Sequence, residues 1–284
     1  MTTSTITTTS TITTTSTITT TSNATMTTSN PAVRESPSCL ASGTTPVAMP
    51  TSADLDVMAY ARLFQVCDST FPIGSFNHSF GMENYLSDGR IKKAPQFEEW
   101  FEAYFRSQYA YGEGFLVRLT YEALDAGDVR RVWDLDRIIY CSTPARETRE
   151  GTRLIARQMV SLIRLLHAGV PLLDEYADRM AAGESYGNPA LAFALLAHAS
   201  GADARQAFVM YGYSVASTLA QNAVRAVPLG QRQGQVALDR VVSLLGPLWD
   251  LVAGLDESYL GACVPGLELA QMRHETQIAR LFMS

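Results

Sequence analysis

A helical spacing of apolar residues runs through the chain from residue 56 onward, and it constrains the fold more than any other feature. In the clearest segment, side chains spaced i, i+4, i+7, i+8 and i+11 fall on one face of an α-helix. These side chains are Ile155, Met159, Leu162, Ile163 and Leu166. Thr143 and Pro144 supply a cap and a first helical position, and Gly169 and Pro171 close the segment. The pattern predicts a helix of about 25 residues, roughly 37 Å long.

A second strong helix is predicted over residues 204–227, where Pro228 ends it because proline cannot continue the hydrogen-bond ladder. Its small residues Gly212, Ala216 and Ala220 allow a neighbouring helix to approach closely. No run of residues alternates as a strand would. Further helices are expected over 56–66, 78–87, 94–110, 114–126, 129–141, 188–200, 232–245 and 267–281. The sequence therefore predicts an all-α protein, a single bundle of about ten helices with short connections.

The N-terminal residues 1–54 have a different composition. A Thr-Thr-Ser-Thr-Ile-Thr hexad begins at Thr2, Thr8 and Thr14, and its isoleucines form no continuous apolar face. Such a segment buries too little apolar surface to offset the entropy of ordering its backbone. We interpret residues 1–54 as a disordered, low-complexity Thr/Ser-rich tail and residues 55–284 as one helical domain.

Composition excludes several classes of protein. The net charge is −6 and no more than two Lys or Arg residues are adjacent, whereas nucleic-acid binding requires a concentrated basic surface. The longest apolar stretch, 189–197, is far shorter than the ~20 residues that span a bilayer. The scattered cysteines fit reduced thiols in a cytoplasmic protein. We therefore expect neither nucleic-acid nor membrane binding.

Catalytic motifs are also missing. The chain has four histidines, none of them paired at the spacing of a helical metal site, and it has neither a nucleophile elbow nor a phosphate loop. We predict no catalytic residue, no metal-ligating residue and no intrinsically bound cofactor. Two alternatives stay open: a metal-dependent helical hydrolase that uses His78, Glu83 and His274, and a helical adaptor of unrelated function.

The stretch from Asp68 to Leu86 predicts a rigid loop that leads into a helix. Pro72 and Gly74 fix the turn, and Ser75 or Asn77 can cap the helix that follows. The loop presents Phe76 and His78 at the helix start. His78 is either a metal contact beside Glu83 or a structural tie between the loop and a neighbouring helix end, and we favour the tie.

Charged residues mark three further places. Arg146, Glu147, Arg149 and Glu150 alternate in sign within the first turns of a long helix, which fits either a solvated face or an interface. Arg225, in an otherwise apolar helix, must extend to solvent or meet a buried acceptor.

The chain ends on apolar residues, although chain ends are usually frayed and polar. Such an end either packs on the domain or is covered by a partner, and we favour the partner. The apolar residues are Ile278, Leu281, Phe282 and Met283, preceded by His274 and Glu275 and accompanied by Arg280.

Four segments in order resemble the family of the urease accessory protein UreF. They are D-S-T-F-P-I-G-S-F-N-H-S-F-G-M-E-N-Y-L from Asp68, R-E-T-R-E-G from Arg146, N-A-V-R-A-V-P-L-G-Q from Asn222, and M-R-H-E-T-Q-I-A-R-L-F-M-S from Met272. The resemblance covers everything after about residue 55 and nothing before it.

The resemblance implies a non-catalytic, cytoplasmic chaperone of urease maturation that forms a homodimer. It implies binding to UreD (also called UreH), recruitment of the GTPase UreG, and delivery of nickel to apo-urease, with nickel and GTP handled by the partners. It also implies that the C-terminal tail becomes ordered in the complex, that Arg280 helps to dock the GTPase, and that Phe76 belongs to the same surface. The predicted partner-binding set is Phe76, His78, Arg146, Glu147, Arg149, Glu150, Arg225, His274, Glu275, Arg280, Leu281 and Phe282.

Overall fold

The computed structural model describes residues 56–284, and this part of the chain contains eleven α-helices and no β-strand. The all-α prediction is confirmed, whereas the predicted tail lies outside the described residues. The helices are α1 (Val57–Cys67), α2 (Met82–Ser87), α3 (Ala94–Tyr104), α4 (Glu113–Asp125), α5 (Val129–Cys141), α6 (Arg146–Leu166), α7 (Pro171–Ala182), α8 (Pro189–Ala199), α9 (Ala204–Ala226), α10 (Gln231–Ala253) and α11 (Pro265–His274). Short helical turns occur at η1 (Ser75–Asn77), η2 (Phe105–Tyr109, a π-helical segment) and η3 (Glu257–Tyr259).

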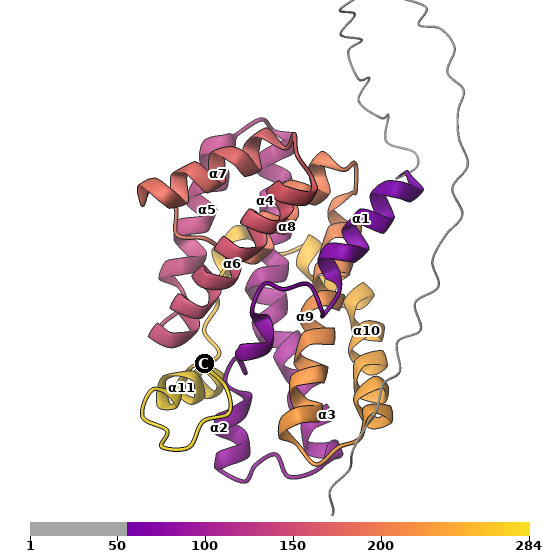
Figure 1. Ribbon diagram of the computed structural model, residues 1–284, viewed down its shortest axis with the longest axis vertical. Coiled ribbons are helices and arrows are strands. Elements are labelled where there is room, and N and C mark those ends of the chain that lie inside the picture. The colour runs from indigo at the N-terminus through magenta and orange to yellow at the C-terminus, as the bar shows by residue number, and fades with distance from the viewer. Residues whose placement is uncertain (1–55) are drawn as a thin grey trace, which may run out of the picture. The chain divides into compact units, whose positions relative to one another are not determined.

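Helix α9 lies at the centre of the bundle, against α10, α4, α8 and α1 (Figure 1). Its small residues allow the close approach that the sequence predicts. A Cβ atom on Gly212 would lie 2.7 Å from a methyl carbon of Leu245 and 2.9 Å from the Tyr109 hydroxyl. The longest apolar stretch of the chain forms α8, which is buried on all sides between α4, α6, α7 and α9. Its lack of a polar face follows from that enclosure.

The long helix α6 is shorter than predicted, at 21 residues. The helix begins at Arg146. Thr143 does not cap it, because the Thr143 hydroxyl donates to the carbonyl of Ile139 at the end of α5. At the other end, Pro171 does not merely close α6. It occupies the first turn of α7, a helix that the sequence pattern did not predict, where the N–H that proline lacks would have no helical partner in any case.

Other helix boundaries differ from prediction for identifiable reasons. The expected 94–110 helix changes into the π-helical η2 at Phe105. Helix α10 continues through Pro247, beyond the predicted end at 245, and the buried Leu248 and Val252 hold its last turns against the core. Within residues 56–284, no helix has the combination of length and apolarity needed to cross a bilayer.

The first and last of the segments that resemble the UreF family are less helical than predicted. Helix α2 starts at Met82 and not at residue 78, because Phe80 and Gly81 have positive φ angles of 51° and 96°. Helix α11 ends at His274 and not at residue 281. The backbone N–H groups of Leu281 and Phe282 donate to the carboxylate of Glu83, so they do not form helical hydrogen bonds.

Candidate functional site

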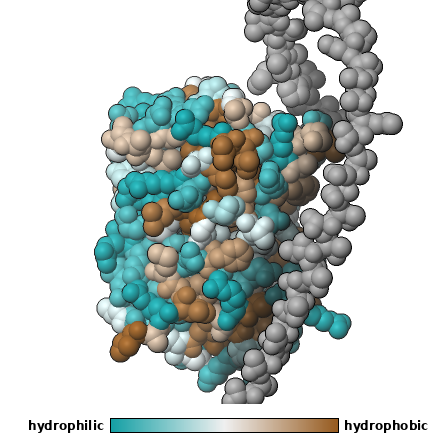
Figure 2. Space-filling model, in the orientation of Figure 1, coloured by the Kyte–Doolittle hydropathy of each residue, from teal (hydrophilic) through white to brown (hydrophobic). Residues whose placement is uncertain are grey.

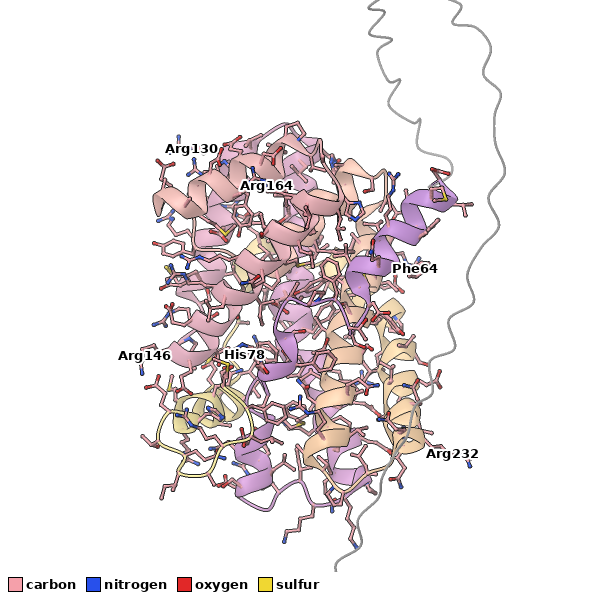
Figure 3. All side chains as sticks on the ribbon, viewed as in Figure 1. Phe64, His78, Arg130, Arg146, Arg164 and Arg232 are labelled. Carbon is pink, nitrogen blue, oxygen red and sulfur yellow. The ribbon has the colours of Figure 1, made fainter. Side chains whose placement is uncertain are left out.

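The segments that carry the sequence motifs meet at one place, which we call the C-terminal corner. It consists of the loop 74–81, the start of α2, the start of α6, the end of α11 and the C-terminal segment, residues 275–284. In Figure 1 this segment loops around α11 beside α2, and in Figure 3 His78 and Arg146 lie at this end of α6. Contacts between α11 and both α2 and α6 hold the corner together.

The loop 74–81 and the residues before it are held by local hydrogen bonds and by backbone geometry. Asp68 accepts hydrogen bonds from the backbone N–H and the hydroxyl of Thr70, both at 2.6 Å. Gly74 has a φ of 86°, which glycine adopts without steric cost. The prediction that Ser75 or Asn77 caps the following helix is wrong, since α2 is preceded by Gly81 and has no side-chain cap. The loop is fixed instead by Asn222 of α9, whose amide donates to the His78 carbonyl at 2.9 Å.

His78 is buried, with 5 % of its surface exposed. Its Nδ1 lies 2.7 Å from the hydroxyl oxygen of Ser284, and its ring packs directly on Gly151 of α6. Burial, with a further contribution from the positive charge of His274, lowers the pKa of His78 to about 4. A structural role is therefore supported, although the ring ties the loop to the C-terminal segment and not to a helix end.

His274 is fully buried between two carboxylates. Its Nε2 lies 3.0 Å from Glu83 Oε2, and its Nδ1 lies 2.7 Å from Glu147 Oε2. Ionised carboxylates only accept hydrogen bonds, so this arrangement places a proton on both ring nitrogens, as in an imidazolium ion. Arg280 adds a second positive charge, 2.8 Å from Glu147 Oε1. The four groups balance to zero net charge, which lowers the cost of burying them.

Glu147 has a pKa below its usual value. Partial burial acts to raise it, but the hydrogen bonds from His274 and Arg280, together with their positive charges, outweigh that effect. The carboxylate is therefore ionised at neutral pH, as the cluster requires.

Glu83 connects this cluster to the C-terminal segment. The backbone N–H of Leu281 donates to its Oε1, and the N–H of Phe282 donates to its Oε2 at 3.0 Å. Two further backbone contacts secure the last residues: Met283 N–H donates to the Asn77 carbonyl at 2.6 Å, and Ser79 N–H donates to the Ser284 carbonyl at 2.5 Å. The apolar chain end is thus packed against its own domain, which corrects the expectation that a partner covers it instead.

Arg225 combines the two predicted outcomes, because it is exposed to solvent and also meets a backbone carbonyl. Its guanidinium donates to the Phe76 carbonyl at 3.0 Å and lies 5.5 Å from the centre of the Phe282 ring. Phe282 is 4 % exposed, while its neighbours Leu281 and Met283 are 53 % and 59 % exposed. One aromatic anchors the segment, and apolar side chains on either side of it face outward. Figure 2 shows apolar surface at this corner of the molecule.

The remaining predicted residues separate into two groups. Arg146 joins the corner through a bidentate ion pair with Glu275, in which Nε lies 3.3 Å from Oε1 and Nη2 lies 3.2 Å from Oε2. Arg149 does not take part, since it donates to the Thr143 and Pro144 carbonyls beyond the end of α5. Glu150 is exposed and pairs with Arg153. The structure therefore brings together ten of the twelve predicted partner-binding residues, Phe76, His78, Arg146, Glu147, Arg225, His274, Glu275, Arg280, Leu281 and Phe282.

The corner does not resemble a metal site. In the part of the chain that the structure describes, no group of three or more His, Cys, Asp or Glu side chains is arranged to hold a metal ion. His274 and Glu83 do meet, but His78 directs its Nδ1 to Ser284. The three residues of the hydrolase alternative therefore do not converge on one point.

Three structural residues of the corner were absent from the predicted set: Glu83, Gly151 and Ser284. All three lie within the quoted motifs. Glu83 is in the loop motif, Gly151 ends the R-E-T-R-E-G run, and Ser284 ends the motif that starts at Met272. Their roles depend on partners far away in sequence. A Cβ atom on Gly151 would lie 2.6 Å from Cε1 of His78, which explains why this helical position is a glycine.

A substitution at this glycine tests that explanation. Ala is a better helix former than Gly by about 1 kcal/mol, so propensity alone predicts that Gly151→Ala stabilises the protein. We expect the opposite, a loss of roughly 1–3 kcal/mol, because the added methyl overlaps the buried ring of His78. Gly246→Ala on α10 is the matched control, since its nearest atom would be 3.9 Å away. Urea denaturation of both variants measures the difference, and equal stabilisation in both would refute the packing argument.

Comparison with known proteins gives a consistent result. Residues 91–242 match the model of the UreF family. The chain is 51 % identical over 232 residues to the urease accessory protein UreF of Streptococcus salivarius strain 57.I, covering 82 % of this chain and 98 % of the relative. It is 42 % identical over 223 residues to the protein of the same name from Lachnoclostridium phytofermentans, covering 78 % and 97 %. A third, from Bacillus sp. strain TB-90, is 39 % identical over 222 residues, covering 78 % and 97 %.

These matches identify the chain at the level of family. The family is one of accessory proteins and not of enzymes, which removes the hydrolase alternative. The family model matches the middle of the described chain, from before α3 into α10. The four motifs that resembled this family lie on elements that the structure assembles around the C-terminal corner or beside it. The chain belongs to the UreF family.

Proposed function

We propose that this protein is a urease accessory protein, a chaperone that acts in assembling the nickel centre of urease. The observation that carries the proposal is the 51 % identity to a urease accessory protein UreF over 98 % of that protein's length. In this proposal it works in the cytoplasm as a homodimer, in complex with UreD/UreH, and recruits the GTPase UreG to apo-urease. Nickel and GTP are carried by those partners, and the protein holds no cofactor of its own.

The C-terminal corner suits a docking role. Its charged interior fixes the C-terminal segment in one conformation, which reduces the entropy cost of binding a partner. Its outer side offers Ile278, Leu281 and Met283, which are largely exposed. Arg280 has 37 % of its side chain exposed while its guanidinium is held by Glu147. Apolar side chains around a fixed arginine are the composition typical of interface centres.

A helical adaptor unrelated to urease is the remaining alternative. Co-expression of urease and its accessory proteins with and without this chain separates the two hypotheses. The proposed function requires that urease purified without the chain contains much less nickel, as measured by atomic absorption. Full nickel content in the absence of the chain would favour the adaptor.

The role of Arg280 can be tested separately from folding. We expect Arg280→Ala to change the free energy of unfolding by at most about 1 kcal/mol, because partly exposed ion pairs contribute little. Recruitment of the GTPase should nevertheless fall by about tenfold, the usual effect of removing one charged interface contact of ~1.4 kcal/mol. A pull-down with purified UreG and UreD/UreH measures this directly.

Arg232→Ala is the matched control for that experiment. Arg232 is exposed on α10 and lies far from His78 and Arg146 in Figure 3. The Arg232→Ala substitution removes the same charge from a different face of the protein. Equal recruitment by both variants would exclude a specific role for Arg280.

A further inference from the structure

A partly enclosed cavity lies between the loop 73–80, helix α6 and helix α9, and the start of α4 contributes to its wall. Its interior is small, about 40 Å³, and its mouth opens to solvent. Most of its wall is apolar, including Ile73, Ile155, Met159 and Val215. The cavity is separate from the charged cluster of the C-terminal corner and shares only the loop with it.

Phe80, which lines the cavity, has an unusual backbone. It is the only residue other than glycine in the described chain with a positive φ, at 51°. A bulky side chain in this region is strained, and such strain is concentrated at ligand clamps and active sites. The hydrogen bond from Gln271 to the Phe80 carbonyl, at 3.2 Å, helps to hold the conformation.

Glu113 is the feature of this cavity that a purely structural role does not explain. It is the only charged side chain among the residues that line the cavity, and none of the salt bridges within residues 56–284 involves it. Glu113 is the first residue of α4 and is partly exposed at the surface. Burial of its carboxyl raises its pKa to about 7, against the lowering effect of a hydrogen bond from Tyr211. At neutral pH this carboxyl is therefore about half ionised, and its ionised form has no paired cation among the described residues.

The neighbouring titratable groups do not supply that cation. Tyr104 of α3, Tyr109 of η2 and Tyr211 of α9 surround Glu113, and burial raises the pKa of each hydroxyl far above its ordinary value. They stay neutral, and each can donate a hydrogen bond, accept one through its oxygen, or offer aromatic surface. Tyr104 and Tyr211 line the cavity together with Glu113.

This combination selects one class of ligand. An anion is repelled by the carboxylate, and a neutral apolar molecule would leave its charge with no counter-ion, at a cost in free energy. Divalent metal ions require several oxygen or nitrogen ligands in a fixed geometry, whereas the cavity offers a single carboxyl. An organic cation is satisfied by one carboxylate, by aromatic rings and by hydroxyl groups.

We propose that this cavity binds a primary ammonium group carried on a short aliphatic chain, with the Glu113 carboxylate as counter-ion. Tyr104 and Tyr211 contact the ammonium group, and the apolar wall covers the methylene groups. The same chemistry is found in a free alkylamine and in the lysine side chain of a partner protein.

The proposal makes a prediction about pH with a definite sign. Only the ionised carboxyl binds the cation, so affinity follows the ionised fraction of Glu113. With a pKa of about 7, that fraction is about tenfold larger at pH 8 than at pH 6. The ammonium group stays protonated over this range, since its ordinary pKa is about 10.4. Affinity should therefore fall about tenfold from pH 8 to pH 6.

Isothermal titration calorimetry on the full chain, at constant ionic strength, tests the proposal with three probes. We expect n-butylammonium chloride to bind at pH 8 and the neutral isostere n-butanol to bind at least about tenfold more weakly. The third probe is N-acetyl-lysine N-methylamide. If it binds as n-butylammonium does, the site accepts a lysine side chain; if only n-butylammonium binds, the site accepts a free amine.

Two variants complete the test. Glu113→Gln keeps the size of the side chain and should weaken n-butylammonium binding by at least about tenfold, while Glu99→Gln removes the same charge from the exposed face of α3 and should not. The pH series on the unaltered protein provides a second measurement if Glu113→Gln folds poorly. Equal binding of n-butanol, pH-independent binding, or absence of n-butylammonium binding would each overturn the proposal.

Discussion

Replacing Glu83 by Ala is expected to release the C-terminal segment from the domain and to cost roughly 3–5 kcal/mol of stability. The carboxylate accepts hydrogen bonds from the backbone N–H groups of Leu281 and Phe282 and faces the ring of His274. Removing it leaves a buried positive charge with one carboxylate fewer and leaves two backbone donors without acceptors. Each of these losses acts in the same direction, which is why the expected effect is large.

Amide hydrogen exchange gives the sharpest measurement of this effect. In Glu83→Ala, the amides of Leu281 and Phe282 should exchange at least about a hundredfold faster, since 1.4 kcal/mol corresponds to about a factor of ten. Amides in the middle of α9 should stay protected if the segment detaches locally. Glu99→Ala, which removes an exposed acid on α3, should change neither. Unchanged exchange at Leu281 and Phe282 would show that Glu83 does not hold the segment.

Acid is expected to destabilise the protein through His78. The pKa of this side chain is lowered to about 4 in the folded protein, against about 6.5 in an unfolded chain. Between these values the unfolded state binds more protons than the folded state, so stability falls as the pH decreases from 6.5 toward 4. At 1.36 kcal/mol per pH unit, the loss amounts to at most about 3 kcal/mol.

The variant His78→Asn isolates this contribution. Asparagine can keep the hydrogen bond that Nδ1 makes to Ser284, but it does not titrate. Urea denaturation from pH 7 to pH 4.5 should give a steeper loss of stability for the natural protein than for the variant. The carboxylates titrate in both proteins and cancel in the comparison. Parallel curves would mean that His78 is not buried in its neutral form.

The sequence determined the fold class because helical periodicity is a local property. Apolar side chains three and four residues apart must share a face of a helix, whatever else the chain does. For the same reason the small residues of α9 predicted close packing, and Gly212 confirms it. Local signals were weaker at the helix ends. Thr143 bonds to α5, and Pro171, which was predicted only to close α6, begins α7.

The candidate site was only partly predictable. The motifs named ten residues that the structure gathers, because each motif has an unusual composition for its position in the chain. The motifs did not show that Arg149 and Glu150 belong elsewhere, since alternating charges on a helix look alike whether they meet a partner or solvent. They also did not show that Gly151 makes room for a histidine ring more than seventy positions away.

The sequence by itself therefore determined the absence of familiar catalytic motifs and every described helix except α7. It predicted the bounds of α1, α4, α5, α8 and α9 to within one residue. Only the tertiary structure decided that His274 lies between Glu83 and Glu147, that Glu83 holds the backbone of Leu281 and Phe282, and that Glu113 faces an apolar cavity. The physical reason is the separation along the chain between the residues that interact. Helix formation follows from neighbours a few residues apart, whereas a buried charge finds its partners only after distant segments have packed and excluded water around it.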